Sequence, residues 1–182
     1  MTTAAGAQHP KDALGPTLAR GALSGLAGVT VMTAWQKLVE MPITGREDSY
    51  EPANLLLRVL PIAPKHGAAK RRLNYAAHFG VGLGWGAAHA AITRRTGHRG
   101  QRAVATVFGT LWPGDVTTTV ALGLNPPPWR WSRRDLAIDL ADKLVLAQAT
   151  GAVYDRLRAG RAAAVCPNPR DRPRGQEPAV RA

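Results

Sequence analysis

The stretch that decides the fold is AVATVFGTLWPGDVTTTVALGLNPPPW, residues 103–129, which holds a single charged side chain, Asp115. Asp115 lies near the middle of this stretch and directly follows Pro113-Gly114, a pair that disfavours helix. A carboxylate is costly in hydrocarbon unless it is protonated, paired or turned toward a polar cavity. The stretch therefore predicts a helix inside a membrane bundle, with Asp115 facing the other helices.

Three further segments have the length expected of membrane-spanning helices. A helix needs roughly 20 residues, mostly apolar, to cross a hydrocarbon core of ~30 Å. With its flanks the uncharged run Gly21 to Gln36 reaches this length, and the other two are residues 73–93 and 136–157; within the stretch described above, the span is residues 103–124. The segment 136–157 is the least apolar, because Asp139, Asp142 and Lys143 fall in its first half. The sequence thus predicts an all-α fold, a four-helix transmembrane bundle.

The connectors and ends complete the predicted organisation. Pro52 to Leu60, inside the long connector 41–72, has one apolar face and a proline in its first turn, so it predicts a short extra helix in the first external loop. We expect a flexible N-terminus over residues 1–16, a four-span membrane domain over 17–158 and a disordered basic tail over 159–182.

The charge balance allows two kinds of partner. The 182 residues contain 24 Lys and Arg against 12 Asp and Glu, a formal net charge of +12. Such a chain can bind nucleic acid or place basic loops beside anionic lipid. Aromatic residues make up only 5%, which is few for a base-stacking surface, so no specific nucleic-acid partner is expected and the lipid bilayer is the expected partner.

Orientation follows from the loop charges. An even number of spans places both termini on one side of the membrane. The short acid-free loop on that side carries four arginines, namely Arg94, Arg95, Arg99 and Arg102. Short basic loops stay in the cytoplasm. We therefore predict a multi-pass protein of the inner (plasma) membrane with both termini cytoplasmic.

Glycines four residues apart predict close helix packing. Lipid offers no hydrophobic drive for helix association, so small residues that let backbones approach must supply the contact. Gly21 and Gly25 form such a pair in the first span, and Gly80 with Gly84 in the second, where a further pair interleaves. The same faces could also join two copies of the chain. A nucleotide loop is not indicated, since no Walker lysine follows and G-x-G-x-x-G spacing is missing.

Ionisable side chains at membrane depth form a predicted polar intramembrane cluster. Its members are Asp115, Asp139, Asp142, Lys143, His78 and His89. His78 and His89 are three helical turns apart and therefore share a face, and Asp139 and Lys143 are one turn apart and can pair. Structural pairing that holds the helices in register is the favoured interpretation. A proton relay or an ion site is the alternative.

The Pro113-Gly114 pair is predicted to mark a helix break. It is either a kink whose freed carbonyl is satisfied by neighbouring helices or a broken helix whose backbone helps to bind a solute. No Ser-His-Asp order, Cys-His pair or H-E-x-x-H motif is found, so the sequence predicts no catalytic residue, no metal and no cofactor.

Several runs resemble a known family. They are GTLWPGDVTTTVALGL at 109–124, NPPPWRW at 125–131, GAVY at 151–154 and the first span GALSGLAGVTVMTAW at 21–35. Over most of residues 17–158 the chain is similar to the YagU-like inner-membrane proteins and related small bacterial multi-pass proteins of unknown function. The resemblance implies a four-helix membrane bundle and no established activity. Where that pattern often has a histidine in the last helix, this chain offers Asp139, Asp142 and Lys143, so a role of that histidine does not carry over.

Three functions remain open at this stage. The favoured one is a non-enzymatic integral membrane protein with a polar core and a structural, transport or stress role. The second is a proton- or ion-coupled transporter, or a membrane-embedded enzyme, that uses the Asp/Lys cluster. The third is a soluble, basic, helical nucleic-acid-binding protein, which rests on the number of basic residues.

Overall fold

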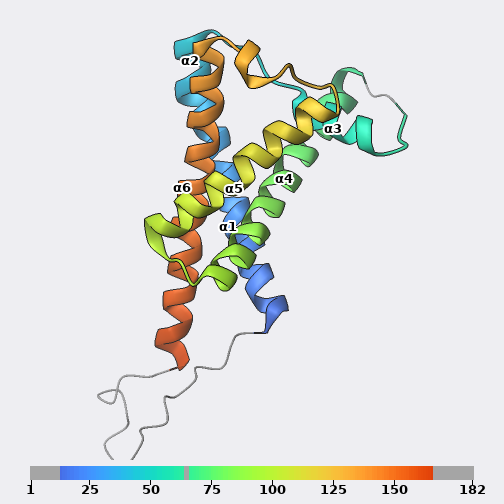
Figure 1. Ribbon diagram of the computed structural model, residues 1–182. Helices are drawn as coiled ribbons and strands as arrows, with labels where there is room; N and C mark the ends of the chain where they lie inside the picture. The colour runs from blue at the N-terminus through green and yellow to red at the C-terminus, as the bar shows by residue number, and fades with distance from the viewer. Residues whose placement is uncertain (1–12, 64–65, 166–182) are drawn as a thin grey trace, which may run out of the picture.

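The computed structural model describes residues 13–63 and 66–165, and this part of the chain is all-helical without a β-strand. Four long helices form its body and correspond to the four predicted segments: α1 (Leu14–Trp35), α4 (Gly67–Thr96), α5 (Gly100–Ala121) and α6 (Arg133–Val165). Figure 1 shows α1 in the middle of the bundle and the start of α1 at the same end as the last turns of α6. The predicted all-α class is confirmed.

The helices agree with the predicted segments in position, but they differ from the prediction in hydropathy and in length. Over the residues described, none of the helices is at once long enough and apolar enough to qualify as a membrane crossing. α1 already begins at Leu14, and α6 continues beyond residue 158 to Val165, so both are longer than predicted. Residues 1–12 and 166–182 of the predicted flexible ends lie outside the described residues.

The end of α1 is extended by two short elements. A π-helical turn, η1 (Gln36–Glu40), follows without interruption, and α2 (Met41–Thr44) continues it until Gly45, whose φ of 67° ends the helix in the left-handed region. Such a residue is the usual stop signal of a helix. A π-turn shifts the side chains that follow it relative to an α-helix and is frequent at functional sites.

The predicted short helix is present as α3 (Glu51–Val59). Asn74 of α4 fastens its start: the side-chain oxygen accepts a hydrogen bond from the Ala53 N–H at 3.0 Å, and the side-chain nitrogen donates to the Ser49 carbonyl at 2.9 Å. At the same end of the bundle, the 3-10 turn η2 (Pro128–Arg130) leads into α6. Ser132 caps α6 by accepting a hydrogen bond from the Asp135 N–H at 3.0 Å.

Glycines allow α1 and α4 to touch at the backbone. A Cβ on Gly25 would overlap the Gly82 carbonyl oxygen and lie 2.8 Å from the Gly86 Cα. A Cβ on Gly21 would lie 2.5 Å from the Gly86 carbonyl oxygen. Gly21 and Gly25 therefore lie in a helix contact that no larger residue could form in this geometry.

The glycines of α4 that make this contact are not the predicted pair. Gly80 and Gly84 are exposed, and a Cβ on either would meet nothing within 4 Å. The interleaved pair Gly82 and Gly86 faces α1 instead, and Val29 of α1 packs directly on Gly82. Two pairs with the same spacing lie on different faces of one helix, and spacing alone could not identify the inner face.

α5 is not broken at Pro113-Gly114, and a kink at Pro113 stays a prediction. α5 runs without interruption from Gly100 to Ala121 with Pro113 in its interior. Pro113 and Gly114 are both exposed, and a Cβ on Gly114 would meet nothing within 4 Å. A proline removes one backbone donor and crowds the preceding turn, but the hydrogen bonds on either side hold the segment helical.

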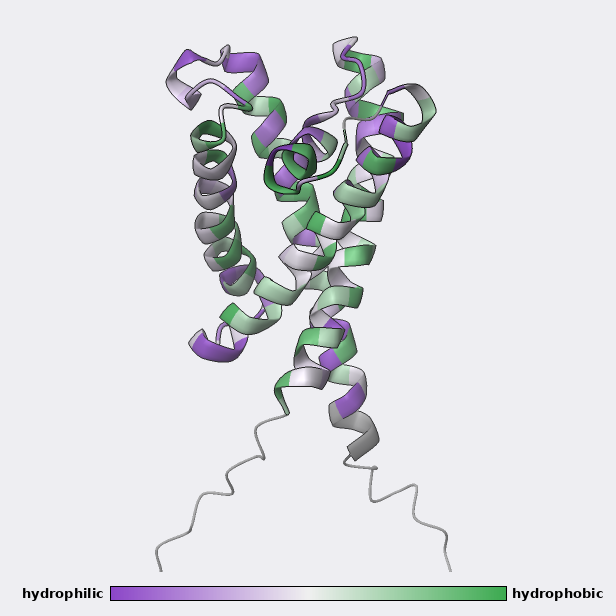
Figure 2. Ribbon diagram, turned by 90° about the vertical axis from the view of Figure 1, so that its right-hand side faces the viewer, coloured by the Kyte–Doolittle hydropathy of each residue, from purple (hydrophilic) through white to green (hydrophobic). Residues whose placement is uncertain are grey.

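Apolar and polar side chains are distributed in an unusual way. Large apolar side chains are exposed along the outer faces of the long helices: Leu23, Leu26, Val31, Val81, Leu83 and Leu144. Small and polar side chains fill many of the contacts between them: Gly21, Ser24, Gly25, His89, Thr93 and Thr150. Figure 2 shows strongly hydrophilic residues gathered mainly toward the two ends of the bundle.

Candidate functional site

Asp115, Asp139 and Lys143 come together between α5 and α6. The Lys143 Nζ atom lies 2.5 Å from the Asp115 Oδ2 atom and 2.8 Å from the Asp139 Oδ1 atom. The side chains retain only 18% to 25% of their exposure. Trp112 Nε1 donates a further hydrogen bond to the other Asp139 oxygen at 2.8 Å. The triad combines two carboxylates with one ammonium, so one negative charge is left over.

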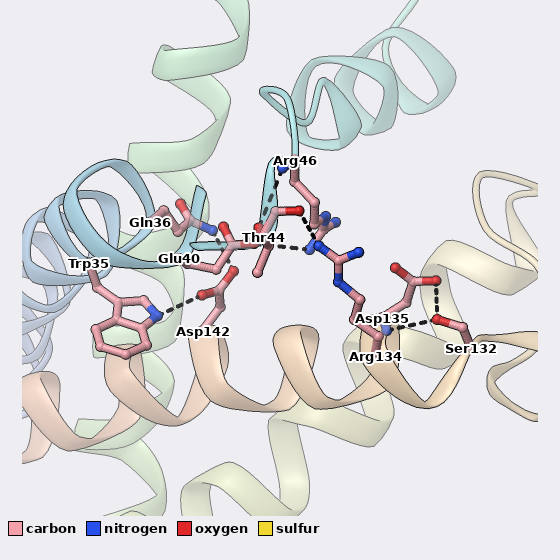
Figure 3. A network of polar contacts seen from close by, with 9 residues as sticks. All are labelled: Trp35, Gln36, Glu40, Thr44, Arg46, Ser132, Arg134, Asp135 and Asp142. Carbon is pink, nitrogen blue, oxygen red and sulfur yellow. Dashed lines mark hydrogen bonds and ion pairs between the residues drawn. The ribbon is translucent and has the colours of Figure 1, made fainter. Parts of the chain in front are cut away.

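Asp142 stands apart from this triad and faces the end of α1. It is 8% exposed and accepts hydrogen bonds from Trp35 Nε1 at 3.1 Å and from Gln36 Nε2 at 2.8 Å (Figure 3). Both donors are neutral, and no basic side chain of the described residues lies within ion-pair distance of this carboxylate. Asp142 is thus a second buried acid whose charge is not compensated by a direct partner. Trp35 and Gln36 were not singled out in the sequence, although they end its first uncharged run.

Glu40 adds a third acid from the η1 turn. It is 8% exposed, accepts a hydrogen bond from Thr44 Oγ1 at 2.8 Å and lies 3.8 Å from an Arg46 guanidinium nitrogen. Arg134 of α6 reaches across to donate to the Thr44 carbonyl (Figure 3). Arg46 lies in the predicted connector 41–72 and Glu40 directly before it, and no periodic signal marked either residue.

The two histidines do not join one cluster. The His78 Nε2 atom lies 3.0 Å from Thr33 Oγ1 of α1. His89 is 1% exposed, and its ring packs edge-on against Tyr154 of α6 with 5.3 Å between ring centroids. Neither ring nitrogen of His89 has a hydrogen-bond partner among the described residues. His78 lines the same cavity as the acidic side chains, whereas His89 lies in a separate contact with α6.

A cavity of about 240 Å³ connects these groups. It extends from residues 46–51 at one end of the bundle, of which 46–49 are exposed, inward to Val29, Trp85 and Leu146. His78 and Tyr75 also line it. Its charged lining consists of seven acids and four bases, namely Glu40, Glu47, Asp48, Glu51, Asp115, Asp139 and Asp142 with Lys37, Arg46, Arg71 and Lys143.

The bases in the cavity are largely engaged by the acids. Lys37 pairs with Asp48, and this hydrogen bond raises the pKa of the Lys37 ammonium above its usual value. Lys143 pairs with Asp115 and Asp139, and Arg46 lies close to Glu40. What remains is an excess of carboxylate in a partly enclosed space, an arrangement suited to a proton or to a small cation. Within the described residues, no three His, Cys, Asp or Glu side chains are grouped so that they could hold a metal ion.

Comparisons of the chain with protein-family models, with curated proteins and with solved structures give no match. The resemblance to YagU-like proteins therefore stays a prediction.

Proposed function

We propose that the chain is a non-enzymatic integral membrane protein, a four-helix bundle whose acidic cavity binds a small cation. The membrane location is supported by the placement of side chains. Many large apolar residues stand on the outside of the long helices, and small and polar groups lie between the helices beside a small apolar cluster of Val29, Met32, Trp85 and Leu146. A water-exposed bundle gains most by burying its large apolar side chains. A bundle in lipid gains by packing small residues and pairing polar groups inside.

The modest hydropathy of the single helices is consistent with this location. The residues that lower the hydropathy of α1 are mainly small or hydroxyl-bearing, and they face the interior: Thr17, Gly21, Ser24, Gly25 and Gly28 are all buried. The outward-facing side of the same helix carries Leu23, Leu26 and Val31. Lipid would meet this outer side alone, so the average over the whole helix understates the apolarity of its surface.

The two ends of the bundle differ in charge. The end that holds the start of α1 and the last turns of α6 is basic, with Asp155 as the single acid of its described residues. Its arginines are Arg20, Arg94, Arg95, Arg99, Arg102, Arg156, Arg158 and Arg161. The opposite end mixes acids and bases around the cavity. This asymmetry supports the predicted cytoplasmic position of the basic end.

Cation binding rests on the excess of carboxylate in the cavity, and above all on Asp142. A buried carboxylate held only by neutral donors would gain from a bound positive charge. The cavity is lined from the protein exterior to the buried core, which supplies a path for the ion. Its size and its exposed mouth favour a monovalent ion or a small amine over a large solute.

Alkaline-carbonate extraction of membranes tests the location. We expect the full chain to remain in the membrane pellet, together with an integral membrane marker. Release into the supernatant with a peripheral marker would refute membrane insertion.

Thermal unfolding of the purified chain in detergent tests the cavity. Sodium, potassium and methylammonium chlorides serve as probes, with the bulky tetrabutylammonium chloride as the size control. We expect one small cation to raise the melting temperature in a saturable way, and D142N to abolish that rise. D155N is the matched control, because it removes one charge at the other end of α6. An equal response in D142N and the parent chain would refute the assignment.

A further inference from the structure

A second hollow lies on the outside of the bundle, between the η1–α2 segment and the first turns of α6. Its volume is about 250 Å³. Aliphatic side chains form most of its wall: Val39, Ile43, Ala137, Ile138 and Ala141. Ile43 is 79% exposed, so the groove presents apolar surface outward instead of burying it. An exposed apolar groove of this kind suits a hydrocarbon chain.

One basic side chain stands at the rim of the groove. Arg134 lines it and donates a hydrogen bond to the Thr44 carbonyl. Arg46 approaches the same turn, because its guanidinium lies 3.8 Å from the Glu40 oxygen that Thr44 Oγ1 also contacts. Figure 3 shows both guanidinium groups extended toward this turn from opposite sides. Guanidinium groups are well suited to bind phosphate oxygens.

Among the described residues, no carboxylate forms an ion pair with Arg134. Glu40 is 8% exposed, and its carboxylate is occupied by Thr44 and Arg46. Asp135, the residue that follows Arg134, accepts a hydrogen bond from Ser132 at 2.7 Å and belongs to the helix cap. The rim of the groove is therefore available to an anion.

The surroundings of the groove resemble a membrane interface. Trp129 in η2 is 81% exposed and Leu38 in η1 is 77% exposed. Arg130 and Arg133, which flank Trp131 and Ser132, are exposed as well. Exposed tryptophans beside arginines are typical of the headgroup region of a bilayer.

We propose that this groove is a binding site for one anionic phospholipid. An acyl chain lies along Ile43, Ala137 and Ala141, and the lipid phosphate meets Arg134. The site suits an amphiphilic ligand with an anionic head, since the apolar wall and the cationic rim adjoin each other. The proposal rests on the membrane location proposed above, but it concerns a different surface from the acidic cavity.

Native mass spectrometry of the full chain in detergent tests the site with two probes, phosphatidylglycerol and phosphatidylcholine of the same acyl chains. We expect one phosphatidylglycerol to be retained in preference to phosphatidylcholine. R134Q should lower its retention about tenfold, and R134K should keep part of it. R133Q is the matched control, because Arg133 is exposed and does not line the groove, and it should leave retention unchanged. A137W, which fills the groove from an exposed position, should also displace the lipid.

The outcomes separate the groove from the membrane location. Equal loss of lipid in R133Q and R134Q would show general charge attraction and overturn the site. Unchanged retention in A137W would overturn the acyl-chain position. If carbonate releases the chain from membranes while phosphatidylglycerol binding still depends on Arg134, the groove stands and membrane insertion fails. If R134Q unfolds, R134K tests the contact with the phosphate in its place, and A137W tests the position of the acyl chain.

Discussion

The Lys143 Nζ atom lies 2.5 Å from the Asp115 Oδ2 atom, so an ion pair joins α6 to the middle of α5. Asp139, one turn before Lys143 on α6, holds the same ammonium at 2.8 Å. The ammonium thus separates two carboxylates that would otherwise repel each other across the helix contact. This pair explains how a lone acid in an apolar segment can be accommodated.

Loss of this ammonium should destabilise the bundle. K143M would leave Asp115 and Asp139 facing each other without a cation, and removal of one partner of a buried pair costs about 3 kcal/mol. K37M is the control, because Lys37 pairs with Asp48 near the surface and exposed pairs contribute about 1 kcal/mol or less. Thermal unfolding in detergent measures both, and the double variant D115N/K143M should recover part of the loss. Equal effects of K143M and K37M would contradict a structural role of the triad.

Two glycines of α4 should respond in opposite ways to the same substitution. G86A places a methyl group 2.6 Å from the Gly25 Cα and against the Gly21 carbonyl, so α1 and α4 must separate and stability must fall. G84A points into open space on the same helix, and alanine in a helix interior is about 1 kcal/mol more favourable than glycine. We expect a lower melting temperature for G86A and an unchanged or higher one for G84A. The reverse order would mean that the other face of α4 is the packed one.

The helical segments could be predicted from the sequence because charge-free runs and prolines mark where helices begin and end. The side that each helix buries could not be predicted. Gly80/Gly84 and Gly82/Gly86 have the same spacing, and only the position of Val29 on the facing helix distinguishes them. Similarly, one face was predicted for His78 and His89, but their neighbours belong to different helices.

Part of the candidate site could also be predicted from the sequence. Asp115 and Lys143 stood out because they are charges in apolar surroundings. Trp35 and Gln36 carried no such signal, although they donate hydrogen bonds to Asp142, because these bonds form only once the end of α1 packs against α6. The charged residues 46–48 and 51 of the connector, and Glu40 directly before it, resembled ordinary loop charges in the sequence, but they line the cavity.

His89 allows a test of whether a buried histidine has a polar role. Its ring nitrogens have no partner among the described residues, and a buried polar group without a hydrogen bond costs about 1–3 kcal/mol. H89L, which keeps most of the volume, should therefore be neutral or stabilising in thermal unfolding. H89A should cost about 2 kcal/mol or more, because it leaves a void beside Tyr154. A strong loss of stability in H89L would reveal a polar interaction of this histidine beyond the contacts described.

Pro113 should be replaceable, because α5 is helical on both sides of it. P113A restores a backbone N–H that can donate to the Gly109 carbonyl and removes the clash of the proline ring with the preceding turn. Proline in a helix interior is about 3 kcal/mol less favourable than alanine, so the melting temperature should rise. G114A, at the next position, adds a methyl group that meets nothing within 4 Å and serves as a control for helix propensity alone. If P113A lowers the melting temperature while G114A raises it, the proline sets a bend that the bundle needs, and the kink interpretation of Pro113-Gly114 gains support.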